Sequence, residues 1–137
     1  MAAHTLDSSA ILAYYYREPG WQRMVRLFTS AGHGRDDLTM HAVNAGEVYY
    51  VAYRDSGEAR ARQVLTHLRN LPLRLQHRIS IDLLREAGRL KATYPIAYAD
   101  AYAVALARLS GGRLVTCDRS ELSPLEARGE VHCLWLR

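Results

Sequence analysis

Short apolar runs alternate with longer helical patterns along most of this 137-residue chain. Residues 73–79 alternate apolar and polar side chains with a period of two, which predicts a strand. Residues 21–30 instead repeat apolar side chains at helical spacing, which predicts a helix. Strands and helices that alternate in this way predict a three-layer α/β/α domain around a mostly parallel sheet of about five strands.

Proline and glycine separate the predicted elements, as at Pro19-Gly20, Pro72 and Gly111-Gly112. We find no internal repeat, low-complexity tract or domain boundary, and the length suits one hydrophobic core. The chain is therefore expected to form a single domain over residues 1–137. The expected strands are 3–6, 38–42, 73–79, 113–117 and 131–136, and the expected helices are 8–16, 21–30, 43–54, 58–70, 81–92, 98–109 and 120–127.

Four acidic residues stand at or near the junctions between these elements. Asp7 and Asp118 each follow a predicted strand, while Glu47 and Asp100 lie in predicted helices beside apolar neighbours. Ligands of parallel α/β sheets bind beyond the carboxyl ends of the strands, so we expect the four acids to face one crevice. Crowded carboxylates repel one another unless a cation neutralises them. The sequence therefore predicts that these four acids form one metal pocket.

The predicted ligand atoms are all oxygens, which suits Mg²⁺ or Mn²⁺ better than zinc, whose sites prefer His and Cys. Ser8, Ser9 and Thr116 add hydroxyl groups beside two of the acids. A divalent cation in such a pocket can bind a phosphate oxygen and supply hydroxide near neutral pH. The pattern therefore favours hydrolysis of phosphodiester bonds.

Each acid also has an explanation that involves no metal. Asp7 can simply cap the first helix, and Asp100 can stabilise the first turn of its helix through the helix dipole. Asp118 can belong to a turn, and Glu47 can be a solvated helix residue. These alternatives stay open for each acid taken alone.

The charge balance favours a polyanionic partner. The chain has 18 basic and 14 acidic side chains, so neutralising the four pocket acids would leave a basic excess of eight. Nucleic acids are held mainly by contacts between phosphates and Arg or Lys. Two cysteines without metal-ligand spacing indicate a reducing compartment, and no apolar run approaches membrane length. We therefore expect a cytoplasmic protein without a membrane partner.

Four stretches of the chain resemble, in order, the motifs of the PIN domain, and within that family they are most similar to the VapC toxins of VapBC toxin–antitoxin pairs. The likeness runs from the first strand to Trp135, so it covers nearly the whole chain. The stretches centre on Leu6-Asp7-Ser8-Ser9, Asn44-Ala45-Gly46-Glu47, Tyr98-Ala99-Asp100-Ala101 and Leu114-Val115-Thr116-Cys117-Asp118.

The resemblance implies a metal-dependent endoribonuclease that acts as the toxin of a type II toxin–antitoxin pair. It implies that the four acids hold Mg²⁺ or Mn²⁺, with Ser8, Asn44 and Thr116 in supporting positions. It also implies a homodimer and a VapB-like antitoxin whose C-terminal segment fills the groove of the toxin. The alternative is a catalytically inactive PIN module that binds RNA or has a regulatory role.

The sequence departs from the family pattern at two positions. Ala97 stands three residues before the third acid, where relatives often have Ser, and Leu122 replaces the usual Phe after the fourth acid. Both departures concern the surroundings of the acids and leave the acids themselves in place.

Two aromatic clusters and two basic residues are further candidates for RNA binding. Arg17 and Lys91 could contact phosphate, and the tyrosines could stack bases, receive an antitoxin, or simply pack at the edge of the core or in a dimer. The clusters are Tyr14, Tyr15 and Tyr16, and Tyr49, Tyr50 and Tyr53.

Overall fold

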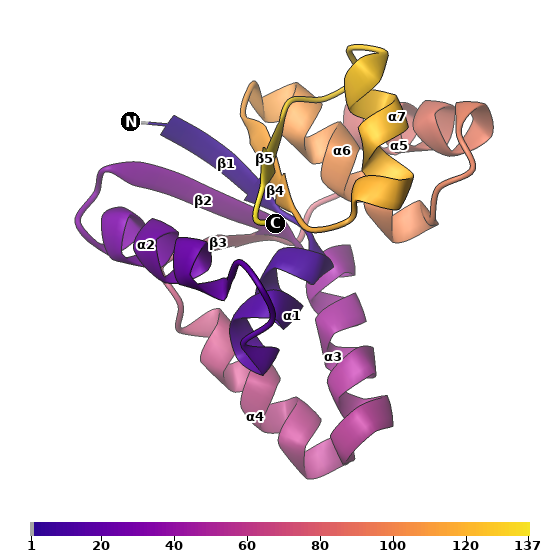
Figure 1. Cartoon of the computed structure of the whole chain (residues 1–137). Coiled ribbons are helices and arrows are strands. Elements are labelled where there is room, and N and C mark those ends of the chain that lie inside the picture. The colour runs from indigo at the N-terminus through magenta and orange to yellow at the C-terminus, as the bar shows by residue number, and fades with distance from the viewer. Residues whose placement is uncertain (1) are drawn as a thin grey trace.

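A computed structural model describes residues 2–137 of the chain, and a five-stranded sheet lies at its centre (Figure 1). The order of the strands is β3-β2-β1-β4-β5, and every neighbouring pair is parallel. The prediction of a mostly parallel sheet of five strands is therefore confirmed. The strands are β1 (Ala2–Leu6), β2 (Asp36–His41), β3 (Arg74–Gln76), β4 (Arg113–Thr116) and β5 (Cys133–Trp135).

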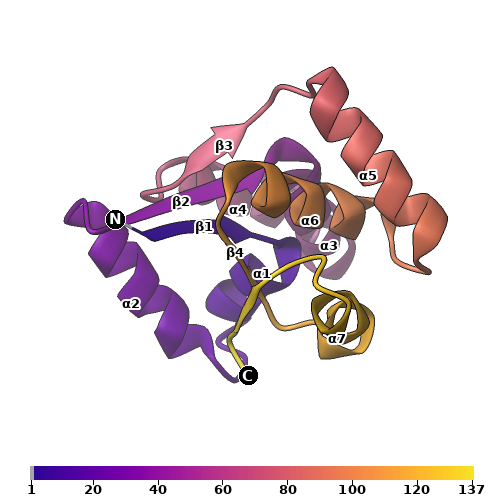
Figure 2. The ribbon, with the colours of Figure 1, turned by 90° about the horizontal axis from the view of Figure 1, so that it is seen from above.

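Helices cover both faces of this sheet, as the three-layer prediction requires (Figures 1 and 2). One group packs with the core that contains Leu6, Met40 and Val115, and the other packs with the core that contains Leu114. The first group is α1 (Ser8–Tyr16), α2 (Trp21–Gly32), α3 (Ala42–Ser56) and α4 (Glu58–Arg69); the second is α5 (Ile81–Thr93), α6 (Tyr98–Ser110) and α7 (Arg119–Ala127).

The edge strands are shorter than the sequence predicts. β3 covers 74–76 instead of 73–79, because its partner strand β2 ends at His41, opposite Gln76. Beyond Gln76 the alternating pattern continues in the sequence but has no strand to pair with. β5 likewise ends at Trp135, opposite the last residue of β4. The alternation of side chains alone could not reveal where the neighbouring strand stops.

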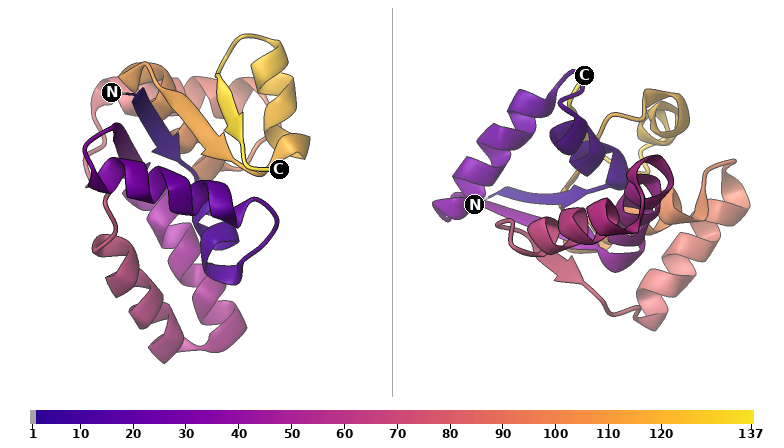
Figure 3. Two further views of the ribbon diagram at one scale, coloured as in Figure 1. Left: turned by 60° about the vertical axis from the view of Figure 1, so that its left-hand side comes forward. Right: turned by 90° about the horizontal axis from the view of Figure 1, so that it is seen from below.

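The connection between α1 and α2 turns sharply beside the C-terminal segment (Figure 3). Arg17 ends α1 in the left-handed conformation, with φ of 51°, and Gly20 precedes α2 with φ of 97°. A side chain at Gly20 would collide with the backbone carbonyl of Leu136, so glycine is required there for space as well as for its positive φ. Within residues 2–137, none of the helices combines the length and apolar character that crossing a membrane demands.

The strand order changes direction between β1 and β4, the two central strands. β2 and β3 extend the sheet on one side of β1, and β4 and β5 extend it on the other. A switch point of this kind opens a crevice at the carboxyl ends of the strands. Asp7 comes directly after β1, and Asp118 is the second residue after β4. Both acids therefore lie at that crevice.

Candidate metal centre

Asp7 is fixed at the end of β1 by three hydrogen bonds. Its Oδ1 accepts from the backbone N–H of Ala10 at 3.0 Å and from the Ser9 hydroxyl at 2.7 Å, and its Oδ2 accepts from the Thr116 hydroxyl at 2.5 Å. The bond to Ala10 makes Asp7 the N-cap of α1. Only 1% of the residue is exposed, and this burial raises the pKa of the carboxyl to about 6 against the opposing effect of the hydrogen bonds. Capping and membership of an acidic pocket are therefore compatible for Asp7.

Thr116 and Ser9 join the ends of the two central strands. The Thr116 hydroxyl donates to Asp7 and accepts from the backbone N–H of Asp118 at 3.0 Å. The Ser9 hydroxyl donates to Asp7 and accepts from the backbone N–H of Cys117 at 2.9 Å. The sequence showed the Ser9 hydroxyl beside Asp7, but Ser9 was not predicted to be a supporting residue of the site. These contacts place Asp118 beside Asp7.

Glu47 reaches the pocket from α3. Its Oε1 accepts a hydrogen bond of 2.6 Å from the Ser8 hydroxyl, which ties the beginning of α1 to α3. Asn44, one turn earlier on α3, donates to the carbonyl oxygen of Ala99 at 3.0 Å and so holds the first turn of α6. Asn44 is fully buried, and its Oδ1 has no hydrogen-bond partner within residues 2–137. The structure thus brings Ser8, Glu47 and Asn44 to the same end of the sheet.

Asp100 occupies the first turn of α6 and is the most perturbed acid of the pocket. Burial, followed by the neighbouring carboxyl of Glu121 and the charge of Asp7, raises its pKa to about 9. The charge of Glu47 acts in the same direction. Since such repulsion falls with distance, this pKa indicates that several carboxylates crowd around Asp100.

Glu121 is a fifth acid, and sequence reasoning missed it. Asp100, Asp118 and Glu121 each offer a carboxylate oxygen, and these three atoms lie within 4.8 Å of one another. Asp118 caps α7 by accepting from the backbone N–H of Glu121 at 3.3 Å. The Oε2 atom of Glu121 is buried and has no hydrogen-bond partner in the described part of the chain. The available signal was an acid three residues after Asp118, in the first turn of a predicted helix.

Arg17 and Lys91 take part in other interactions. The Lys91 ammonium group donates to the carbonyl oxygen of Ile96 at 2.6 Å, which holds the loop before α6. The Arg17 guanidinium lies over the ring of Trp21, 5.2 Å from its centre, at the far end of α1 from Asp7. Their predicted contacts with RNA remain predictions.

The two departures from the family pattern have structural explanations. Ala97 is the N-cap of α6 and offers no side-chain hydrogen bond to the helix that carries Asp100. Leu122 is completely buried and belongs to the same core as Leu83, Leu90 and Leu125. Neither residue changes the positions from which the acids reach the pocket.

The residues of this pocket fit a divalent cation that binds oxygen. Burial, together with the neighbouring carboxyl groups, raises the pKa of Asp100 to about 9. A buried carboxylate oxygen of Glu121 and a buried amide oxygen of Asn44 also lack donors within residues 2–137. Mg²⁺ and Mn²⁺ favour such oxygen ligands, whereas zinc favours His and Cys. The donor set therefore suits the two metals predicted from the sequence.

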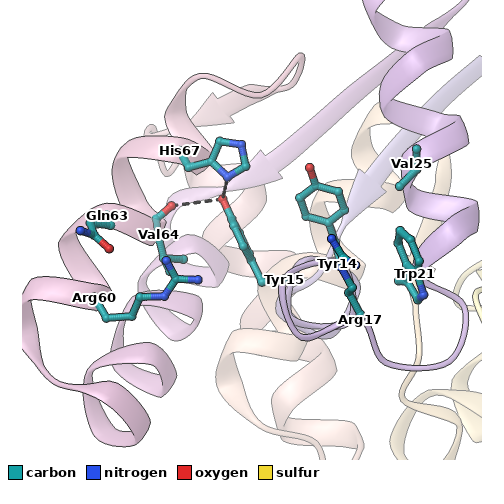
Figure 4. Close-up of a pocket in the computed structure, with 9 residues that line it drawn as sticks. All are labelled: Tyr14, Tyr15, Arg17, Trp21, Val25, Arg60, Gln63, Val64 and His67. Atoms are coloured by element: carbon teal, nitrogen blue, oxygen red, sulfur yellow. Dashed lines mark hydrogen bonds between the residues drawn. The ribbon is translucent and has the colours of Figure 1, made fainter.

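A separate hollow of about 480 Å³ lies between α1, α2 and α4 (Figure 4). The Tyr15 hydroxyl donates to the carbonyl oxygen of Val64 at 3.3 Å and meets Nδ1 of His67 at 2.8 Å. Tyr14 packs edge-on against Tyr15, with ring centres 5.3 Å apart. Tyr14, Tyr15, Arg17, Trp21, Val25, Arg60, Gln63, Val64 and His67 line this aromatic hollow, and no acid is among them.

Comparison with known families and structures gives consistent results. The family model of the PIN domain matches residues 5–123. Among curated proteins, no sequence matches the chain. A DNA-bound VapBC of Salmonella typhimurium superposes with a TM-score of 0.74 at 16% identity, and the alignment covers 100% of both chains.

Two further solved structures are similar. VapBC2 of Rickettsia felis, bound to a promoter DNA fragment, has a TM-score of 0.73 at 12% identity, over 96% of this chain and 97% of that chain. The Mycobacterium tuberculosis toxin VapC20, described as cleaving the sarcin–ricin loop, has a TM-score of 0.69 at 16% identity, over 88% and 94%. At these identities the likeness establishes the fold.

Proposed function

The chain belongs to the PIN domain family, and from this premise we propose that it is a metal-dependent endoribonuclease and the toxin of a type II toxin–antitoxin pair. The single domain over 1–137 and a cytoplasmic location are part of the same proposal. The observation that carries it is the convergence of Asp7, Glu47, Asp100, Asp118 and Glu121 at the switch point of the sheet. Asp7 and Asp100 are buried and the other three acids are partly buried, and carboxylates crowded in this way need a counter-charge, which a divalent cation can supply.

We assign the cation, Mg²⁺ or Mn²⁺, to Asp7, Glu47, Asp100 and Asp118, together with Glu121. When bound, it would neutralise the carboxylates, polarise a phosphate oxygen and lower the pKa of water. Thr116 and Ser9 keep the Asp7 carboxylate in a fixed orientation, and Ser8 does the same for Glu47. Asn44 orients the backbone next to Asp100. The chain's own residues thus mainly hold charge in place, and they need no covalent step with the RNA.

Cleavage of RNA by the purified protein is the test. We expect Mn²⁺ or Mg²⁺ to support endonucleolytic cleavage, EDTA to stop it, and labelled single-stranded DNA of the same sequence to be cut more slowly. Asp7→Asn and Asp100→Asn should each lose about 100-fold or more in rate, as when a main electrostatic contact is removed from an active site. Wild-type rates in these variants would refute the assignment.

The same experiment separates the alternative, a PIN module that binds RNA without cutting it. Such a module would retain RNA in a binding assay and give no cleavage products with either metal. All four family acids are present in this chain, which favours the active enzyme.

We further propose that a VapB-like antitoxin places an apolar or aromatic segment in the aromatic hollow. Four solved structures similar to this chain are VapBC proteins, from Rickettsia felis, Haemophilus influenzae, Salmonella typhimurium and Mycobacterium tuberculosis. The hollow combines aromatic walls from Tyr14 and Trp21 with the guanidinium groups of Arg17 and Arg60, so it suits a segment that is apolar and acidic. Co-purification with the product of a short neighbouring gene, reduced by Trp21→Ala, tests this partner.

The homodimer is also a proposal. Exposed apolar side chains before and on α5, at Ile79, Ile81 and Leu84, support it by offering a surface that a second copy could cover. Sedimentation of the purified chain measures the oligomeric state directly.

A further inference from the structure

One face of α3 leads outward from the acidic pocket. Tyr50 and Arg54 follow Glu47 by three and seven residues, so all three side chains share a face of the helix. At a rise of 1.5 Å per residue, Arg54 lies about 10 Å along the helix axis from Glu47. A polymer whose phosphate lies at the acids can therefore reach these side chains.

α1 packs against α3, and the two helices begin side by side (Figures 1 and 3). The two helices are joined at their beginnings by the hydrogen bond from Ser8 to Glu47. Tyr16, the last residue of α1, is close enough to contribute to the pKa of the Arg54 guanidinium, which the neighbouring Asp55 mainly raises. Tyr16, Tyr50 and Arg54 thus gather on one surface next to the pocket.

The two tyrosine rings are available to a ligand. Tyr16 is 47% exposed and Tyr50 is 52% exposed, although large aromatic side chains normally gain by burial. The other tyrosine of the same helical end, Tyr15, is half-buried and uses its hydroxyl within the aromatic hollow. Tyr16 and Tyr50 therefore lie outside the core, and the experiments below separate a role in RNA binding from a dimer contact.

Arg54 adds an accessible cation. Its guanidinium lies 5.7 Å from the centre of the Tyr50 ring. It also contacts Asp55 at 3.2 Å, but both side chains are largely exposed, and ion pairs of this kind contribute little to stability. A phosphate can therefore compete for the guanidinium.

We propose that Tyr16, Tyr50 and Arg54 form a stacking platform for unpaired bases of the RNA on one side of the cut. This inference rests on the proposed nuclease function and adds the requirement that the RNA be single-stranded beside the scissile bond. Aromatic rings stack on bases of any sequence, and an adjoining Arg holds the backbone, which is the usual way to bind a single strand. The basic excess of the chain favours the same polyanion over a protein segment.

Kinetics on a short single-stranded oligoribonucleotide with Mn²⁺ test the platform. We expect Tyr50→Leu and Tyr16→Leu each to raise KM about tenfold and to leave kcat nearly unchanged, since one base stack is lost in each variant. Arg54→Gln should raise KM and weaken its dependence on salt. Tyr53→Leu is the control, because Tyr53 is about as exposed on α3 but lies about 120° around the helix from Glu47, with its ring 6.0 Å from that of Tyr49.

A modified substrate makes the test specific for stacking. Abasic nucleotides introduced one at a time near the cut should raise KM for the wild type at the stacked position. The same abasic nucleotide should not raise KM further in the variant that lacks the ring on which that base stacks, either Tyr50→Leu or Tyr16→Leu.

Three outcomes would overturn the platform. If the wild type cuts RNA and the variants keep its KM, the inference fails while the proposed function stands. If the wild type neither binds nor cuts RNA, both fail. If Tyr16→Leu and Tyr50→Leu instead change the sedimenting mass of the protein, the surface is a contact between copies of the chain.

Discussion

The two ends of α1 belong to two different surfaces, the acidic pocket at its beginning and the aromatic hollow at its end. At its beginning, Asp7 and Ser8 belong to the acidic pocket, where buried carboxylates repel one another. At its end, Tyr14 and Tyr15 line the aromatic hollow, where the Tyr15 hydroxyl contacts Val64 and His67 and no acid is present. We propose that the first surface binds a cation and the second an apolar segment of a partner. A short helix can therefore present two unrelated binding chemistries, because each depends only on the elements packed against its own end.

The largest expected difference between the two surfaces is in catalysis. Glu121→Gln removes a charge next to Asp100, and we expect the rate of RNA cleavage to fall on the order of 100-fold. Trp21→Leu changes the hollow and should leave the rate within about twofold, as expected for a substitution away from the reacting groups. The measurement is the rate of RNA cleavage by each purified variant with Mn²⁺. Equal losses of rate in Glu121→Gln and Trp21→Leu would contradict a catalytic role for the acidic pocket alone.

A smaller difference is expected in stability with and without metal. Mn²⁺ at about 100 times its dissociation constant should stabilise the wild type by about 2.7 kcal/mol, and EDTA should remove that gain. Asp100→Asn should be more stable than the wild type in EDTA, because the amide is uncharged in this buried place without having to bind a proton, and should gain less from Mn²⁺. Thermal unfolding measures both effects. If Mn²⁺ stabilises Asp100→Asn as much as it stabilises the wild type, Asp100 is not a ligand of the metal.

The pH dependence of stability sharpens the same comparison. An acid whose pKa is raised to about 9 by folding binds a proton that the unfolded chain has already released. In EDTA, the free energy of unfolding should therefore fall between pH 7 and about pH 9, where Asp100 loses that proton. Denaturant unfolding of the wild type and Asp100→Asn, compared across that range, isolates the contribution of Asp100. Identical slopes would show that this carboxyl does not titrate there.

The smallest expected effect concerns the hollow. Tyr15→Phe removes a hydroxyl that contacts Val64 and His67, and we expect a loss of about 1 kcal/mol in the free energy of unfolding. Because the hollow is independent of the acids, the stabilisation by Mn²⁺ should be unchanged. Denaturant titration with and without Mn²⁺ measures both quantities, and a reduced metal effect would mean that the two surfaces are coupled.

Much of the fold was predictable because it depends on local patterns. Ser80 caps α5, Gly111 ends α6 in the left-handed conformation, and both signals are visible in the sequence. The lengths of β3 and β5 were not predictable, because a strand ends where its neighbour ends. Register between strands is a property of the sheet, and no single stretch of sequence contains it.

The sequence by itself determined which residues could carry the chemistry, since acids after short apolar runs are recognisable without coordinates. Only the tertiary structure decided which of these carboxylates meet, and it added Glu121 and Ser9 to the set. It also divided the tyrosines, placing the half-buried ring of Tyr15 in the hollow and leaving Tyr16 exposed. The physical reason is the same in each case: burial and repulsion depend on distances between segments that are far apart in the chain, and packing sets those distances.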